Sequence, residues 1–176
     1  MVAAVVLAAG AATRFGGPKQ QLLLAPVLER VREAGLTEVV VVAGAHELET
    51  DARTVSCADW ALGPGASLRC GLVALRPAVE AAVVVLADGP ELASAAIDRV
   101  VATWRREGAT LVAASYGGVR GHPLLLARSE WAAVPDEGLR AREPLLVPCD
   151  DLGEPGDVDR PADLPERFRS PSGEPM

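Results

Sequence analysis

The chain has 176 residues, enough for one domain that buries roughly 70% of the surface of its unfolded form. Its 24 acidic and 17 basic residues give a net charge of -7, which argues against binding to nucleic acids or to anionic membranes. Hydrophobic residues make up 49% of the chain and aromatic residues 3%, so we expect an aliphatic core of the kind that parallel sheets favour.

The apolar start of the chain and its cysteines bear on the compartment. The first apolar run lacks a basic segment before it and ends at a glycine turn, which disfavours a signal peptide. No stretch approaches the ~18 uninterrupted apolar residues of a membrane helix, and we therefore expect a cytoplasmic protein. Cys57, Cys70 and Cys149 are odd in number, far apart and without metal-ligand spacing, so we expect reduced thiols.

Strand and helix patterns alternate along the first two thirds of the chain. Apolar, β-rich runs predict strands over residues 2–9, 38–43, 54–57, 81–87 and 110–115. Apolar residues at helical spacing predict helices over residues 27–34, 67–75 and 97–104. The order strand, helix, strand predicts parallel pairing with right-handed crossovers.

The pattern changes after Ser115. Residues 116–123 have turn chemistry, and the apolar run 124–127 predicts a strand that makes the sheet mixed. No domain-sized linker interrupts the chain. We therefore predict one α/β domain over residues 1–168, Rossmann-like and three-layered, with a mostly parallel, mixed central sheet. The tail at residues 169–176 is expected to be disordered.

A glycine-rich turn, LAAGAATRFGGPK, runs from Leu7 to Lys19 directly after the first predicted strand. Such a turn exposes backbone amides to phosphate, and Arg14 and Lys19 can meet the remaining anionic oxygens. The spacing fits neither a P-loop nor a dinucleotide fingerprint. The residues alone therefore allow two interpretations, a phosphate site or an ordinary strand-to-helix loop with solvated cations.

Carboxylates follow in two later segments. Asp88 ends an apolar strand, at the edge where ligands of open α/β sheets bind, and is placed to hold Mg²⁺. Its alternative role is a turn or helix-capping aspartate. Asp157 and Asp159 alternate along an extended segment and suit a shared metal, or else form a solvated acidic loop.

The glycine turn resembles the signature of the nucleotidyltransferases that act on molybdopterin. The segment LADGP resembles their metal-binding motif, GVRGHPLLL resembles a segment of the cytidylyltransferase branch, and GDVDRPADL resembles their terminal motif. These segments occur in the family's order and spacing, and the resemblance covers residues 2–165. It implies a nucleotidyltransferase version of the predicted fold.

The resemblance also implies site residues. The nucleotide-binding positions carried over are Leu7, Ala8, Ala9, Gly10, Arg14, Gly16, Lys19 and Ser67. Catalytic roles fall on Arg14, Lys19 and Asp88, metal binding on Asp88, Asp157 and Asp159, and acceptor binding on Arg120 and His122. Ser67 has a helix cap as its alternative role, and His122 a hydrogen bond within its turn. His46 follows the second strand on the same edge.

The implied reaction is attack by an acceptor phosphate on the α-phosphorus of a nucleoside triphosphate, with release of pyrophosphate. CTP is favoured, GTP is the second choice, and Mg²⁺ is the cofactor. The implied acceptor is a molybdopterin cofactor, and a molybdoenzyme maturation protein is the implied partner. Positioning and charge neutralisation suffice for such a transfer, so no protein nucleophile is required.

The chain departs from the family in the segment after Lys19, which is about ten residues shorter by comparison with the family pattern. Ala12 also stands where the family has a serine. A second hypothesis is an NAD(P)H-dependent quinone or dye oxidoreductase derived from the same family. The departures motivate a third hypothesis, a non-catalytic member that binds nucleotide.

Overall fold

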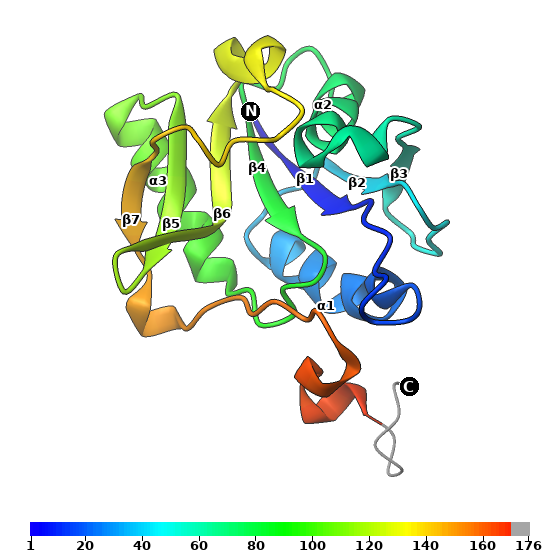
Figure 1. The fold of residues 1–176 in the computed structure, drawn as a ribbon. Helices are drawn as coiled ribbons and strands as arrows, with labels where there is room; N and C mark the ends of the chain where they lie inside the picture. Colours follow the sequence, from blue (N-terminus) through cyan, green and yellow to red (C-terminus); the bar gives the residue numbers. More distant parts are fainter. Residues whose placement is uncertain (170–176) are drawn as a thin grey trace.

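The computed structural model describes residues 1–169, which form a sheet with helices on both of its faces (Figure 1). The seven strands are β1 (Val2–Ala8), β2 (Val39–Ala43), β3 (Arg53–Ser56), β4 (Ala81–Leu86), β5 (Leu111–Tyr116), β6 (Val119–Ala127) and β7 (Leu145–Pro148). The helices are α1 (Lys19–Glu33), α2 (Pro64–Ala74) and α3 (Ser94–Glu107). Short 3-10 helices occupy Trp60–Leu62, Arg128–Ala133, Asp150–Leu152, Pro161–Asp163 and Glu166–Phe168. The expectation for the tail at residues 170–176 lies outside the described residues.

The strand order is β3-β2-β1-β4-β6-β5-β7. β1 pairs in parallel with β2 and β4, while β6 runs antiparallel to both β4 and β5, and β7 pairs in parallel with β5. The predicted mostly parallel, mixed sheet is thereby confirmed. The ends of β1, β2 and β4 meet at one edge because these strands are parallel.

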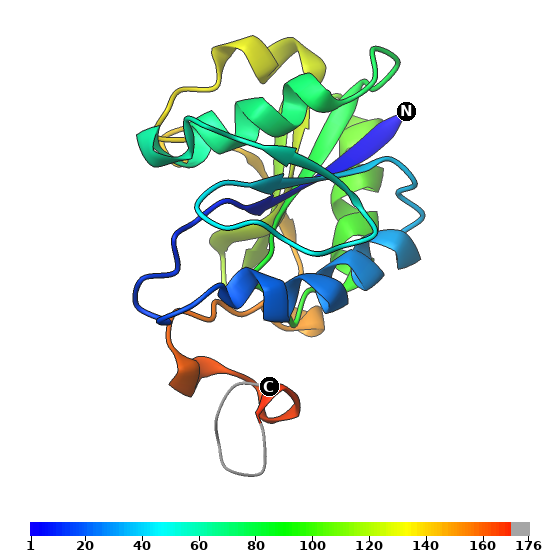
Figure 2. The ribbon, with the colours of Figure 1, turned by 90° about the vertical axis from the view of Figure 1, so that its right-hand side faces the viewer.

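Alternating side chains of the central strands enter two different cores. Ala4 and Val6 of β1 face α1 and α3, whereas Ala3 and Val5 face α2. Figure 2 shows the sheet between these helical layers, which confirms the three-layer prediction. Gly71 lets α2 approach closely, since a Cβ at this position would lie 2.5 Å from Val5 Cγ1.

A third, smaller cluster joins the two ends of the described chain. It consists of Leu23, Val158 and Leu164, with Phe15, Leu22 and Phe168 packed against it. These residues come from the glycine loop, from α1 and from the C-terminal segment. The cluster holds the C-terminal segment against the loop that follows β1.

The helices begin earlier than the apolar pattern predicts. α1 begins at Lys19 and continues through Pro26, although proline normally interrupts a helix. α2 begins with Pro64 after Gly63, and proline is favoured in the first helical turn. Apolar periodicity marks the buried face of a helix, and the first turns of these helices carry few of the residues that would show it.

The expectation of three reduced thiols is wrong for two of them. Cys57 and Cys70 form a disulfide with their Cα atoms 5.8 Å apart, and Cys149 is free and buried. The chain leaves β3 and folds back into α2, which places Cys57 beside the second turn of that helix. Spacing along the chain does not reveal this approach.

No helix in residues 1–169 is long and apolar enough to cross a membrane.

Candidate nucleotide site

The glycine loop after β1 is held through three consecutive carbonyl oxygens. The backbone amide of Ala45 donates to Ala9 O at 3.0 Å, Gln20 Nε2 donates to Gly10 O at 3.1 Å, and His46 Nε2 lies 2.9 Å from Ala11 O. A carbonyl oxygen only accepts hydrogen bonds, so the imidazole must carry its proton on Nε2 in this contact. Each tied carbonyl fixes the plane of its peptide.

The amide N–H of the next residue points opposite to each of these carbonyls, because the peptide unit is planar and trans. The amides of residues 10–14 donate no hydrogen bond to any group within residues 1–169. Gly10 itself is exposed. Backbone N–H groups are obligatory donors, and such a run of unused ones suits an anionic ligand.

The loop then closes in a tight turn around Ala12. Ala12 has φ +50°, and its carbonyl accepts from the amides of Phe15 at 3.0 Å and Gly16 at 3.1 Å. This left-handed conformation costs a residue with a Cβ roughly 1–2 kcal/mol. Strained backbone of this kind is concentrated at ligand-binding sites, where the surrounding contacts maintain it.

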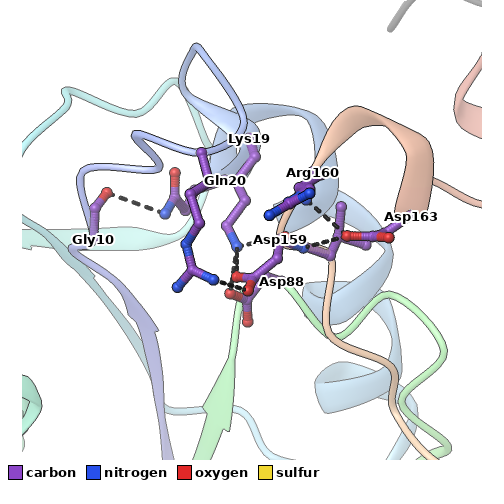
Figure 3. A network of polar contacts seen from close by, with 9 residues as sticks. Gly10, Lys19, Gln20, Asp88, Asp159, Arg160 and Asp163 are labelled. Atoms are coloured by element: carbon purple, nitrogen blue, oxygen red, sulfur yellow. Dashed lines mark hydrogen bonds and ion pairs between the residues drawn. The ribbon is translucent and has the colours of Figure 1, made fainter.

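Lys19 stands at the centre of a charged cluster that joins three distant segments (Figure 3). Its side chain is 7% exposed, and Nζ lies 2.9 Å from Asp88 Oδ2 and 3.7 Å from Asp159 Oδ1. Nζ also donates to the carbonyl of Val158. A buried ammonium with three oxygen neighbours is well satisfied, which explains why a lysine is tolerated there.

Arg14 extends the cluster toward solvent. Its side chain is 69% exposed, and Nη1 lies 2.7 Å from Asp159 Oδ2. Val158 fixes the C-terminal segment beside β4, since its amide donates to Asp88 O at 3.2 Å. The structure therefore brings together Arg14, Lys19, Asp88 and Asp159, as the sequence motifs predict.

Asp157 completes a group of three carboxylates. Burial raises the pKa of Asp157, the negative charges of Asp88 and Asp159 raise it further, and Lys19 and Arg14 oppose the effect. Within residues 1–169, no three acidic, histidine or cysteine side chains are grouped as a ready metal site. Mg²⁺ usually takes only one or two protein carboxylates and completes its shell with water and phosphates, so these residues still fit it.

His122 and Arg120 lie on β6, on the other side of β4. Burial lowers the pKa of His122 to about 4, the charge of Arg120 lowers it too, and Asp88 opposes the shift. His122 is therefore neutral at physiological pH. Arg120 Nη1 donates to the carbonyls of Leu139 at 2.9 Å and Arg142 at 2.7 Å, and burial lowers the pKa of Arg120.

The remaining predicted positions differ in what they can offer to a ligand. Ala8 and Ala9 are buried, so only their backbone is available to a ligand. Ser67 is buried inside α2, and its amide bonds to Gly63 O, which makes the helix-cap alternative wrong. Gly16 has φ +83° and completes the turn after Ala12.

Sequence reasoning missed Gln20. Gln20 is only 4% exposed, and its Oε1 has no partner within the described residues. Nothing in the local pattern distinguishes it from Gln21. His46 was expected at the ligand edge, but its bond to the glycine loop depends on the approach of residues 44–46, which no motif encodes.

The comparisons with known proteins agree with this geometry. The model of the MobA-like NTP transferase domain matches residues 4–144. The chain belongs to this family. No curated protein matches the chain. The predicted resemblance to the molybdopterin nucleotidyltransferases is confirmed at the level of the family.

Solved structures extend the comparison. The Mycobacterium sp. strain JC1 homologue of Rv0371c is 26% identical, with 92% of each chain covered and a TM-score of 0.75. Rv0371c of Mycobacterium tuberculosis is 28% identical, with 92% of this chain and 94% of that one covered and a TM-score of 0.72. Molybdopterin-guanine dinucleotide biosynthesis protein A of Archaeoglobus fulgidus is 14% identical, with 86% of this chain and 85% of that one covered, and it shares the fold with a TM-score of 0.62.

One structure of Rv0371c is a complex with manganese; it is 25% identical, with 84% of this chain and 88% of that one covered and a TM-score of 0.65. The family and these neighbours make the chain a nucleotidyltransferase, whose substrate is a nucleoside triphosphate. The nucleotide, the acceptor and the metal of this chain have to be inferred from its own residues.

Proposed function

We propose that this protein transfers a nucleoside monophosphate from CTP, or less favourably from GTP, to a phosphorylated acceptor in an Mg²⁺-dependent reaction. The proposed acceptor is a molybdopterin cofactor, and the second product is pyrophosphate. The observation that carries this proposal is the row of unused amides at residues 10–14 beside the cations Arg14 and Lys19.

The nucleotide phosphates are proposed to lie on this row of amides. Hydrogen bonds from backbone N–H groups hold an oxyanion without adding a mobile charge. Lys19 supplies a compact positive charge and Arg14 a planar fork with several donors. An oxygen of the acceptor phosphate then bonds to the α-phosphorus, and the bond from that phosphorus to the pyrophosphate oxygen breaks. The developing charge is neutralised by the cations that already surround the site.

Asp88, with Asp157 or Asp159, would hold the metal ion. A divalent ion held there would supply positive charge to neutralise the phosphates. The electrostatics of Asp157 support this assignment, because burial and then the negative charges of Asp88 and Asp159 raise its pKa, and a divalent cation would offset those charges. The manganese complex of Rv0371c is consistent with a divalent ion in this family.

The acceptor is proposed to bind on the β6 side, near His122 and Arg120. A neutral His122 can donate one hydrogen bond and accept another, which suits orientation of a polar acceptor better than charge neutralisation. The likeness of GVRGHPLLL to the cytidylyltransferase branch supports CTP. A cytoplasmic location and a molybdoenzyme maturation protein as partner complete the proposal.

The decisive experiment is a panel of nucleoside triphosphates with Mg²⁺ and molybdopterin, read as pyrophosphate release. We expect release with CTP, less with GTP, and none without acceptor or metal. Tight nucleotide binding without release would indicate the non-catalytic alternative. NADPH consumption with a quinone, unchanged in Asp88→Ala, would indicate the oxidoreductase and contradict the proposal.

A further inference from the structure

The glycine loop owes its shape to side chains outside it. Of the three tied carbonyls, Ala9 O is held by backbone, whereas Gly10 O and Ala11 O are held by the side chains of Gln20 and His46. Neither residue belongs to the motif that identifies the family in this sequence. Both reach the loop from elements that flank it, Gln20 from the first turn of α1 and His46 from the segment after β2.

That segment is itself fixed at two points. The amide of Ala45 donates to Ala9 O, and further along the chain Gln21 of α1 exchanges two hydrogen bonds with the backbone of Glu49, at 2.7 and 3.0 Å. Gly44 permits the approach, because a Cβ there would lie 2.6 Å from Ala9 O. The imidazole of His46 is therefore presented to the loop from a rigid support.

Gln20 carries a cost that a purely structural residue would not be expected to keep. Its Oε1 is buried and has no partner within residues 1–169, and an unsatisfied buried acceptor is destabilising. Its single hydrogen bond goes to Gly10 O, a carbonyl that water could satisfy because Gly10 is exposed. The main effect of this hydrogen bond is therefore to fix the orientation of the peptide, because the carbonyl could find another donor in water.

We infer that His46 and Gln20 are positioning residues for the triphosphate: they hold the carbonyls of Ala11 and Gly10 so that the next two amides, those of Ala12 and Ala11, face the phosphates. The inference rests on the proposed function, since it assigns these amides to phosphate oxygens. It predicts that loss of either side chain weakens phosphate binding without moving Lys19 or Asp88.

The test for His46 compares His46→Ala with His46→Gln. The glutamine amide can place an N–H near the position of Nε2 and restore the bond to Ala11 O. We expect His46→Ala to raise the KM for the nucleotide about three- to tenfold, the effect of losing one hydrogen bond, with little change in kcat. His46→Gln should recover most of this loss, and equal KM values for both variants would overturn the inference.

The test for Gln20 compares Gln20→Leu with Gln21→Leu. Removing the unpartnered Oε1 should leave the melting temperature unchanged or raise it, while affinity for inorganic triphosphate falls about three- to tenfold by calorimetry. Gln21→Leu loses the two hydrogen bonds that help to fix the segment carrying His46, so it should lower stability and should lower triphosphate affinity less than Gln20→Leu does. Unchanged triphosphate affinity in Gln20→Leu would contradict the role.

A third measurement separates this inference from the proposed function. Amide hydrogen exchange at Phe15 and Gly16, which bond to Ala12 O, reports the order of the loop without any ligand. We expect faster exchange in His46→Ala than in the wild type. If the wild type binds neither CTP nor triphosphate, the proposed function fails; if exchange is also unchanged, the positioning role fails independently.

Discussion

The two sides of the site are held in opposite ways. On the proposed nucleotide side, side chains and one amide bind the carbonyls of residues 9–11, and the amides of residues 10–14 have no partner within residues 1–169. On the acceptor side, guanidinium groups bind the carbonyls, as Arg120 does with Leu139 and Arg142. Arg142 in turn pairs with Glu130. The loop amides on the first side thus have no partner within residues 1–169, whereas on the second side Arg120 is engaged and Arg142 Nη1 has no partner among the described residues.

This difference bears on how each substrate can bind. A triphosphate meets donors that need no rearrangement, so preorganisation favours its binding. An anionic acceptor must compete with carbonyls for Arg120, or use groups such as neutral His122. We therefore expect nucleotide binding to need little rearrangement of the chain, and acceptor binding to depend more on how the loop around residue 140 rearranges.

The largest expected effect tests whether the charged cluster between the two sides acts in catalysis. Asp88→Asn removes a carboxylate from the proposed metal site and leaves Lys19 without its nearest carboxylate. We expect pyrophosphate release to fall by about a hundredfold or more, as when a main electrostatic contact is removed. The matched control is Asp98→Asn, an exposed aspartate on α3. Equal rates for both variants would remove Asp88 from the mechanism.

The disulfide belongs to the nucleotide side and gives the next effect. It closes a loop of about 14 residues, and a disulfide of that size contributes about 2–4 kcal/mol to the free energy of unfolding. We expect the double variant Cys57→Ser, Cys70→Ser to lose this amount in urea unfolding. A reductant should lower the stability of the wild type and leave the double variant unchanged; identical effects on both would show that the bond is absent in solution.

The acceptor side should be the more sensitive to acid. Because the pKa of His122 is lowered to about 4 from 6.5, the unfolded chain binds the extra proton first. Stability from this residue is present above pH 6.5 and is lost as the pH falls toward 4, by at most about 1.4 kcal/mol per unit. The raised pKa of Asp157 has the opposite effect. Its contribution to stability is lost as the pH rises through and above the ordinary pKa of an aspartate.

The measurement is the free energy of unfolding of the wild type and of His122→Gln between pH 4 and 7. The free energy of unfolding of the wild type, minus that of His122→Gln, should increase as the pH rises from 4 to 7. Parallel pH profiles would mean that His122 titrates normally and is not buried against Arg120.

The smallest expected effect concerns Asp159, which occupies both Arg14 and Lys19. A phosphate must compete with this carboxylate for the same cations. Asp159→Asn should therefore strengthen metal-free binding of triphosphate by about three- to fivefold, since an exposed ion pair is worth less than about 1 kcal/mol. With Mg²⁺ present the gain should disappear if Asp159 is also a metal ligand. Weaker metal-free binding would contradict the competition.

The sequence predicts β1, β2, β4 and β5 well because buried strands have continuous apolar runs, but it does not predict β7, and it assigns turn chemistry to residues 119–123, where β6 begins. The end of β1 and the end of β4 were placed correctly, and with them the loop, Lys19 and Asp88. The antiparallel insertion of β6 between β4 and β5 could only be expected in general terms, because strand order depends on connections between segments far apart in the chain.

What sequence reasoning could not supply are contacts that no spacing encodes. The bond from His46 to Ala11 O, the burial of Gln20 and the pairing of Cys57 with Cys70 all depend on how one element lies against another. The start of α1 is missed because its first turn is polar and Pro26 interrupts the pattern, although Leu23 and Leu24 are buried at helical spacing from Val27 and Leu28. Such features follow from tertiary packing, and motifs along the chain record only part of it.

The small cluster around Leu23 has a consequence for biosynthesis. It packs Phe15, from the start of the chain, against Val158, Leu164 and Phe168, near the end of the described residues. The sheet can form once β7 has emerged, but the carboxylates at 157 and 159 and the apolar cover of Phe15 come later. A nascent chain therefore carries the glycine loop long before residues 157–168 emerge to complete the proposed site.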